Sequence, residues 1–209
     1  MRYAVITGDL ISSSASTEEV VSDTMNLIRT IANEVGPDTR FTRHRGDGWQ
    51  IVLTQPGLAL RAMCYIAAHL ASAGWLQSRM VIGLGTAGGL SGYSLAAASG
   101  TAFTASGRAL DHVPKGRMLD LAGEGVDPLH VTLIAYIDSQ IQGWSPEQAE
   151  AVAHMLTITP PPAQVVTAAK LGISRQAFAA RLATAGFDMI DAATNAFFEA
   201  FGEAHERNA

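Results

Sequence analysis

The chain has 209 residues, which suits one domain, or a domain of about 140 residues followed by a small module. Hydrophobic residues make up 48% and charged residues 16%, so the chain can bury a core and is unlike disordered proteins. The net charge of −5 argues against non-specific, electrostatically driven binding to nucleic acid. The single cysteine, Cys64, excludes an internal disulfide and a cysteine metal site. The apolar run MRYAVITGDL is too short for a signal peptide, and no stretch approaches the length of a membrane span, so we expect a cytoplasmic protein.

Apolar runs and helix-capping residues predict the elements of the first part of the chain. An apolar, β-branched strand comes first, and Thr17 and Gly36 are the expected start and stop of the helix after it. Two short strands flank a Gly-Asp-Gly turn, and Pro56 opens the next helix. The predicted elements are strand 2–8, helix 17–36, strands 39–45 and 48–54, helix 56–73, strand 79–87, helix 100–112, and segments at 118–121 and 130–140.

This order, strand–helix–strand–strand–helix–strand, is typical of the ferredoxin-like, split βαβ arrangement, so we predict an α+β fold. In that topology the first strand lies inside the sheet, beside the third. The end of the first strand and the hairpin between the second and third then share one edge. Asp9, which ends YAVITGD, and Asp47, in RHRGDGWQIVL, are therefore expected to lie near each other.

Two neighbouring carboxylates repel each other unless a positive group lies between them. Mg²⁺ is the natural occupant, because it binds through one or two carboxylates and leaves its other positions to water and phosphate. We therefore interpret Asp9 and Asp47 as candidate ligands of Mg²⁺ or Mn²⁺. The alternative is that Asp9 caps the next turn and Asp47 merely serves the hairpin.

A glycine motif further along, Gly83-Leu84-Gly85-Thr86-Ala87-Gly88, matches GxGxxG. A dinucleotide fingerprint requires the first strand of the fold and a helix immediately after it. This motif follows a later strand and runs into a glycine- and serine-rich segment, so we do not favour that interpretation.

The pattern changes after Trp144, so we divide the chain into residues 1–143 and 144–209. Ser145 and Pro146 start one helix. The stretch AQVVTAAKLGISRQAFAARLATAG then predicts two helices around a turn at Gly172, which is the helix-turn-helix pattern. Residues 163–186 would bind DNA, with these side chains at the start of the second helix or beside it: Ser174, Arg175, Gln176 and Arg181.

The charge of this second part leaves another interpretation open. Residues 145–209 contain four Lys and Arg against seven Asp and Glu, whereas DNA-binding modules are usually basic. Much of the acid lies in the last predicted helix, which can pack away from DNA. The same module could instead dock a protein or form a dimer.

The residues quoted above resemble the palm-like catalytic domain of class III nucleotide cyclases, a fold shared with diguanylate cyclases. The resemblance implies that Asp9 and Asp47 bind metal and that Arg43 contacts the purine. The run GTAFTASGR, residues 100–108, is similar to the cyclase pattern Gly-x-x-Val-Asn-x-x-x-Arg. By that likeness Arg108 holds the phosphates and stabilises charge in the transition state, and Thr104 replaces the usual asparagine.

Nearly the whole chain also looks like the SatD family of small bacterial proteins. The likeness rests on YAVITGDLISS, RHRGDGWQIVL, RMVIGLGTA, SGTAFTASGRAL and ISRQAFAARLATAGFDMI. It implies a nucleotide cyclase-like domain joined to a helix-turn-helix.

Together these features predict a cytoplasmic regulator that binds a nucleotide with Mg²⁺ and contacts DNA as a homodimer. Two alternatives remain: an active nucleotidyl cyclase, and a non-enzymatic dimerisation or assembly protein.

Overall fold

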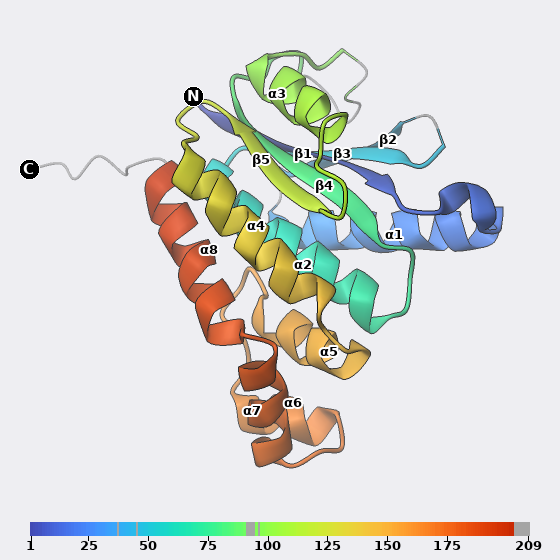
Figure 1. Ribbon diagram of the computed structural model, residues 1–209, viewed down its shortest axis with the longest axis vertical. Helices are drawn as coiled ribbons and strands as arrows, with labels where there is room; N and C mark the ends of the chain where they lie inside the picture. Colours follow the sequence, from blue (N-terminus) through green and yellow to red (C-terminus); the bar gives the residue numbers. More distant parts are fainter. Residues whose placement is uncertain (37, 45, 91–94, 96, 203–209) are drawn as a thin grey trace, which may run out of the picture.

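The structure is a computed structural model that describes residues 1–36, 38–44, 46–90, 95 and 97–202. In this part of the chain an α+β fold forms from a mixed five-stranded sheet and eight α-helices (Figure 1). The strands are β1 (Tyr3–Leu10), β2 (Arg40–His44), β3 (Gly48–Leu53), β4 (Ser78–Gly85) and β5 (Leu119–Gly123). The helices are α1 (Glu18–Val35), α2 (Ala59–Ser72), α3 (Thr101–Leu110), α4 (Pro128–Gln142), α5 (Pro146–Met155), α6 (Gln164–Lys170), α7 (Arg175–Thr184) and α8 (Phe187–Phe201), with 3₁₀ turns η1 (Ser13–Ala15) and η2 (Pro56–Leu58). No helix within these ranges has both the length and the apolar character needed to cross a membrane.

The strand order across the sheet is β2-β3-β1-β4-β5. The pairs β2/β3, β3/β1 and β1/β4 are antiparallel, and β4/β5 is parallel. The first strand therefore lies in the middle of the sheet beside the third, which confirms that part of the expected topology.

Most expected helix boundaries are confirmed within one or two residues, because the capping residues act as predicted. The Thr17 hydroxyl accepts a hydrogen bond from the Val20 amide, and Gly36 follows the last residue of α1. Ser145 caps α5 in a capping box with Gln148. One boundary differs. Pro56 opens the 3₁₀ turn η2, and α2 begins only at Ala59.

Helices cover both faces of the sheet (Figure 1). One face packs on α1 and α2 in a large hydrophobic core that includes Ile6, Ile51 and Ile28. On the other face α3 crosses β4 and touches β1 and β5, and Ala102 packs on Val5. A Cβ atom at Gly83 would collide with the Ala102 carbonyl oxygen and the Ser106 amide. Gly83 and Gly85 of the GxGxxG run thus let α3 lie close to β4, whereas a Cβ atom at Gly88 would meet no atom of the described residues within 4 Å. Helix α3 begins only at Thr101.

After α4, helices α5 and α8 pack against α2, on the same side of the sheet. Helix α8 also packs on η2, and the apolar residues of both helices belong to the same core as the sheet. Arg61 of α2 forms an ion pair with Asp191 of α8. Helices α6 and α7 form the end of the molecule farthest from the sheet (Figure 1).

Gly8 of β1 packs closely on the ring of Trp49 of β3. Trp49 is fully buried, and a Cβ atom added to Gly8 would lie 2.5 Å from two ring atoms and 2.8 Å from the Arg79 carbonyl oxygen. The absence of a side chain at Gly8 therefore makes room for the indole ring beneath the centre of the sheet.

We expect Gly8→Ala to lower the free energy of unfolding by about 1–3 kcal/mol, because the new methyl group overpacks a rigid site. Urea denaturation measures the change. Gly107→Ala is the matched control, because nothing lies within 4 Å of a Cβ there and alanine favours the helix by about 0.5–1 kcal/mol. A Gly8→Ala protein as stable as the wild type would contradict the packing described here.

Candidate functional site

The carboxyl end of β1 brings together the two aspartates that the sequence singled out. Asp9 lies directly opposite Gly48 on β3, and the Leu10 amide donates to the Asp47 carbonyl oxygen at 3.1 Å. The backbones of Asp9 and Asp47 thus lie near each other, as the strand order predicts, while their role as metal ligands stays a prediction.

A buried hydrogen-bond chain fixes the backbone at this edge. The Trp49 indole N–H donates to the Ser78 hydroxyl at 3.0 Å, and that hydroxyl donates to the Asp9 carbonyl oxygen at 2.8 Å. Trp49 and Ser78 are both buried. Three strands, β3, β4 and β1, are thus tied together where Asp9 begins to leave the sheet.

Arg79, which sequence analysis missed, occupies both carboxylate oxygens of Asp9. Its Nε donates to Oδ1 at 3.0 Å and its Nη2 donates to Oδ2, a two-pronged contact typical of arginine with carboxylate. The pKa of Arg79 is raised, first by the hydrogen bond to Asp9, then by the charge of Asp9, and more weakly by the charge of Asp47. Arg79 is therefore the nearest balancing charge for the acidic edge.

Asp47 has different partners from Asp9. Its Oδ2 accepts from the Ser13 hydroxyl, in the 3₁₀ turn that follows β1. Beside it lies an open groove of about 410 Å³, which falls within the size range of ligand pockets. The groove is lined by Ser13, Ser14, Ser16, Glu18, Val21, Arg43, Gly46 and Asp47.

Arg43 lies on the other face of the sheet from Asp9. It pairs with Trp49 and hence with Gly8, and successive strand residues face opposite sides. Its Nε donates to the Gly46 carbonyl oxygen at 2.6 Å, which closes the hairpin beside Asp47. The structure thus groups Arg43 with Asp47, and groups Arg79 with Asp9.

Thr104 and Arg108 are exposed on α3 and do not reach the two aspartates. The sheet-facing side of α3 presents Ser106 instead, whose hydroxyl shares a hydrogen bond of 2.7 Å with that of Thr7. The Thr104 hydroxyl bonds to the Gly100 carbonyl oxygen. Within the described residues, Arg108 forms no hydrogen bond or ion pair with Asp9 or Asp47.

The chemistry of the edge fits a hard divalent cation that binds few protein ligands. Within the described ranges no cluster of three or more His, Cys, Asp or Glu could enclose a metal. A cation here could have at most two carboxylate ligands, Asp9 and Asp47, with water and phosphate as its remaining ligands, as is usual for Mg²⁺. In this structure the two carboxylates point to different partners, Asp9 to Arg79 and Asp47 to Ser13, so both would have to turn to share one ion. The cation would also have to compete with Arg79 for Asp9.

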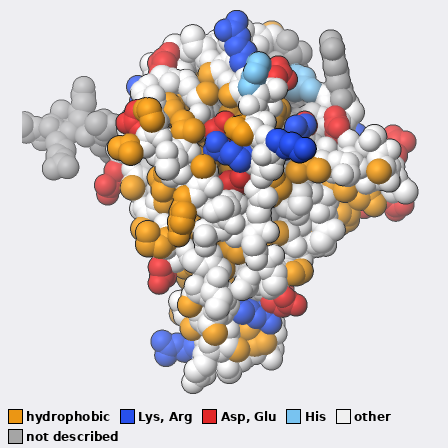
Figure 2. Space-filling view, viewed as in Figure 1, with side chains coloured by type: hydrophobic (Ala, Val, Ile, Leu, Met, Phe, Trp, Pro, Cys, Tyr) orange, Lys and Arg blue, Asp and Glu red, His pale blue; other side chains and the backbone are white. Residues whose placement is uncertain are grey.

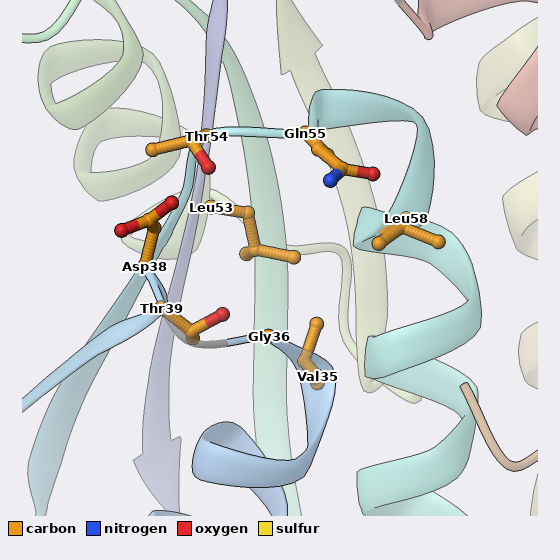
Figure 3. A pocket seen from close by; sticks show the side chains of 8 residues that line it. All are labelled: Val35, Gly36, Asp38, Thr39, Leu53, Thr54, Gln55 and Leu58. Atoms are coloured by element: carbon orange, nitrogen blue, oxygen red, sulfur yellow. The ribbon is translucent and has the colours of Figure 1, made fainter. Parts of the chain in front are cut away.

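A smaller pocket lies at the opposite end of β3 and is drawn in Figure 3. Its volume of about 70 Å³ is far below the roughly 300 Å³ at which ligand pockets begin. The side chains in Figure 3 include Asp38, Thr39, Thr54 and Gln55, and none of them comes from the edge that holds Asp9. We therefore do not regard this pocket as the candidate functional site.

Of the candidate DNA-contacting residues, Ser174 and Arg181 already bond to groups within the protein. Ser174 caps α7 and accepts from the Ala177 amide at 3.1 Å, while Arg175 and Gln176 are exposed beside it. Arg181 donates to Glu150 of α5 at 3.2 Å, so it ties α7 to α5. That pairing could not be seen from the sequence, because the two residues are 31 positions apart.

Neither a known protein family nor a curated protein matches this chain.

We expect Ser78→Ala to lower the free energy of unfolding by about 1–3 kcal/mol, because the buried Trp49 N–H loses its acceptor. Urea denaturation measures the loss, and hydrogen exchange should show faster opening of the Leu10 amide. Ser139→Ala is the control, since the exposed Ser139 hydroxyl bonds only to the Tyr136 carbonyl oxygen. Equal stability of the two variants would mean that the indole hydrogen bond does not hold this edge.

Proposed function

We propose that this chain is a cytoplasmic regulator of the SatD type, which binds a nucleotide with Mg²⁺ or Mn²⁺ in residues 1–143 and DNA in residues 144–209. The observation that carries the nucleotide half is that the backbones of Asp9 and Asp47 are neighbours at one sheet edge, where Asp47 lines an open groove. The DNA half rests on the placement of charge around α6 and α7.

A nucleotide cyclase-like, ferredoxin-like fold is proposed for residues 1–143. The order β2-β3-β1-β4 with three antiparallel pairings supports it, because the split βαβ arrangement needs that order. Strand β5 extends the sheet in parallel with β4.

The groove beside Asp47 suits a phosphate-bearing ligand. Its hydroxyl groups, from Ser13, Ser14 and Ser16, can donate hydrogen bonds to phosphate oxygens, and Arg43 supplies positive charge. Mg²⁺ bound by Asp9 and Asp47 would neutralise phosphate charge and orient the phosphates. The protein's own contribution is a backbone edge that the Trp49–Ser78 chain holds in place.

Binding without turnover is favoured over cyclase activity. Arg108, which the cyclase likeness assigns to the transition state, is exposed on α3 and makes no contact with the aspartates in this chain. A cyclase would therefore need Arg108 from a second copy, as in a homodimer.

Charge is segregated in the proposed helix-turn-helix. Residues 164–184 contain Lys170, Arg175 and Arg181 and no acidic residue. In residues 144–202 the acid lies on α5 and α8, and Asp191 is turned to Arg61 of α2. Figure 2 shows Lys and Arg side chains at the end of the molecule where α6 and α7 lie. The net negative charge of the whole segment thus differs from the local charge of α6 and α7, the helices that would contact DNA phosphates.

Gly172 supports the turn between these two helices. Its φ of +66° is a left-handed conformation that glycine adopts without strain, and α7 begins three residues later. The exposed Arg175 and Gln176 then stand at the start of α7, where recognition helices contact base edges.

For the nucleotide half, we expect ATP or GTP to bind in the presence of Mg²⁺, and Asp47→Asn or Asp9→Asn to weaken that binding at least about tenfold, since each removes one anionic metal ligand. Isothermal titration with and without the metal measures both effects. Asp23→Asn changes an exposed aspartate on α1 and should bind as the wild type does. Absence of metal-dependent binding to either nucleotide would refute this half of the proposal.

For the DNA half, we expect the protein to retain specific genomic fragments in a gel shift at low salt. Arg175→Ala should weaken retention about tenfold, because an arginine contact to a base or phosphate contributes roughly 1–3 kcal/mol. Arg29→Ala, on the distant α1, should change nothing, and Arg181→Ala should lower stability more than DNA affinity because of its pairing with Glu150. No retention, or retention indifferent to Arg175→Ala, would favour a protein-docking or assembly module.

A further inference from the structure

Arg79 is a cation at the proposed nucleotide site to which the sequence motifs give no role, and it is firmly bound to Asp9. It lies on β4 directly opposite Asp9 in the sheet register, so the two side chains leave the same face of the sheet. Its guanidinium contacts both oxygens of Asp9. A cation that binds Asp9 would therefore share its carboxylate with the guanidinium or displace it, and the positive charge of Arg79 opposes that binding.

The side chains of this ion pair can change partners without a change in the fold. The Arg79 side chain is 46% exposed, whereas the Asp9 backbone is held by the buried Ser78 hydroxyl. Because the guanidinium is partly exposed, water can solvate it when the pair opens, although a two-pronged contact is stronger than a typical exposed ion pair. Arg79 and Asp9 can therefore change partners by side-chain rotation, without movement of the backbone.

A phosphate group is the natural second partner for Arg79. The guanidinium fork fits the oxygens of a phosphate as well as those of a carboxylate. A cation bound to Asp9 would take the place of the guanidinium and hold a phosphate within a few ångströms of it. The charge of Asp47 raises the pKa of Arg79 as well, though more weakly than the hydrogen bond and charge of Asp9.

We propose that Arg79 is a phosphate-binding residue of the nucleotide site, and that in the absence of metal it holds Asp9 and competes with the divalent cation. The inference rests on the proposed function. It adds a regulatory consequence: metal and nucleotide bind cooperatively, because Arg79 leaves Asp9 most readily when a phosphate is present to receive it. By thermodynamic linkage, the nucleotide then raises metal affinity by the same factor as the metal raises nucleotide affinity.

The test compares the full-length wild type with Arg79→Gln, which removes the charge, and Arg79→Lys, which keeps the charge without the fork. Two titrations are made on each protein: Mn²⁺ alone, followed by water-proton relaxation, and ATP or GTP at saturating Mn²⁺, followed by calorimetry. Arg117→Gln is the matched control, because Arg117 also pairs with an aspartate of the same sheet, Asp120, with Nη2 and Oδ1 at 3.3 Å.

We expect Arg79→Gln to bind Mn²⁺ alone about tenfold more tightly than the wild type, and to bind the Mn²⁺–nucleotide about tenfold more weakly. The cooperativity between metal and nucleotide should fall accordingly. Arg79→Lys should lie between the two proteins, and Arg117→Gln should match the wild type. Adding Asp9→Asn to Arg79→Gln should abolish the gain in Mn²⁺ affinity.

Other results would contradict the proposed role of Arg79, the nucleotide function, or both. If the wild type binds Mn²⁺–nucleotide through Asp9 and Asp47 while Arg79→Gln leaves both affinities unchanged, the inference is overturned and the proposed function stands. If the wild type binds no nucleotide but Arg79→Gln gains Asp9-dependent Mn²⁺ binding, the competition is supported and the phosphate role is overturned. If no protein binds Mn²⁺ or nucleotide, both the inference and the nucleotide function fail, and the Asp9–Arg79 pair is structural.

Discussion

The candidate site depends on the fit of the Trp49 ring under Gly8. The ring is fully buried, and only a residue without a side chain leaves room for it beneath β1. The indole N–H then reaches Ser78, whose hydroxyl bonds to the Asp9 carbonyl oxygen. A change at any of these residues would disturb packing, hydrogen bonding and the position of Asp9 together.

This packing fixes the backbone at the end of β1, while the charged side chains there can still change partners. Charged side chains of both signs lie where β1 ends: Asp9 is paired with Arg79, and Asp47 lies in the groove that Arg43 and Glu18 also line. Exposed ion pairs are weak, of the order of 1 kcal/mol, so this arrangement stores little stability. Under the proposed function, a ligand that brings both a cation and an anionic group would give new partners to the carboxylates and to the arginine. A metal–nucleotide complex has that composition.

The order of the elements and most of their boundaries could be predicted because local signals determine them. Thr17, Ser145 and Ser174 are short polar residues at helix starts, and each accepts the backbone hydrogen bond expected of a cap. The neighbourhood of Asp9 and Asp47 followed from strand order alone. What could not be predicted depends on register and tertiary packing. Arg79 faces Asp9 only through the pairing of β1 with β4, and Arg181 meets Glu150 only because α7 folds onto α5.

The glycines near the end of β4 also show that a sequence motif alone does not reveal tertiary contacts. A sequence pattern suggestive of a nucleotide loop is explained here by contact, because Gly83 and Gly85 let α3 approach the sheet. Spacing alone does not distinguish a glycine needed for a ligand from one needed for a helix. The difference lies in which atoms a Cβ would meet.

The most direct test of the account is to locate a bound Mn²⁺ by its paramagnetic broadening of backbone amide signals, with ATP or GTP present. The account predicts that the signals of Asp9, Leu10, Asp47, Gly48 and Ser13 broaden first, while those near Thr54 and those of α7 remain sharp. Broadening centred elsewhere, or none at saturating nucleotide, would contradict a metal–nucleotide site at the end of β1.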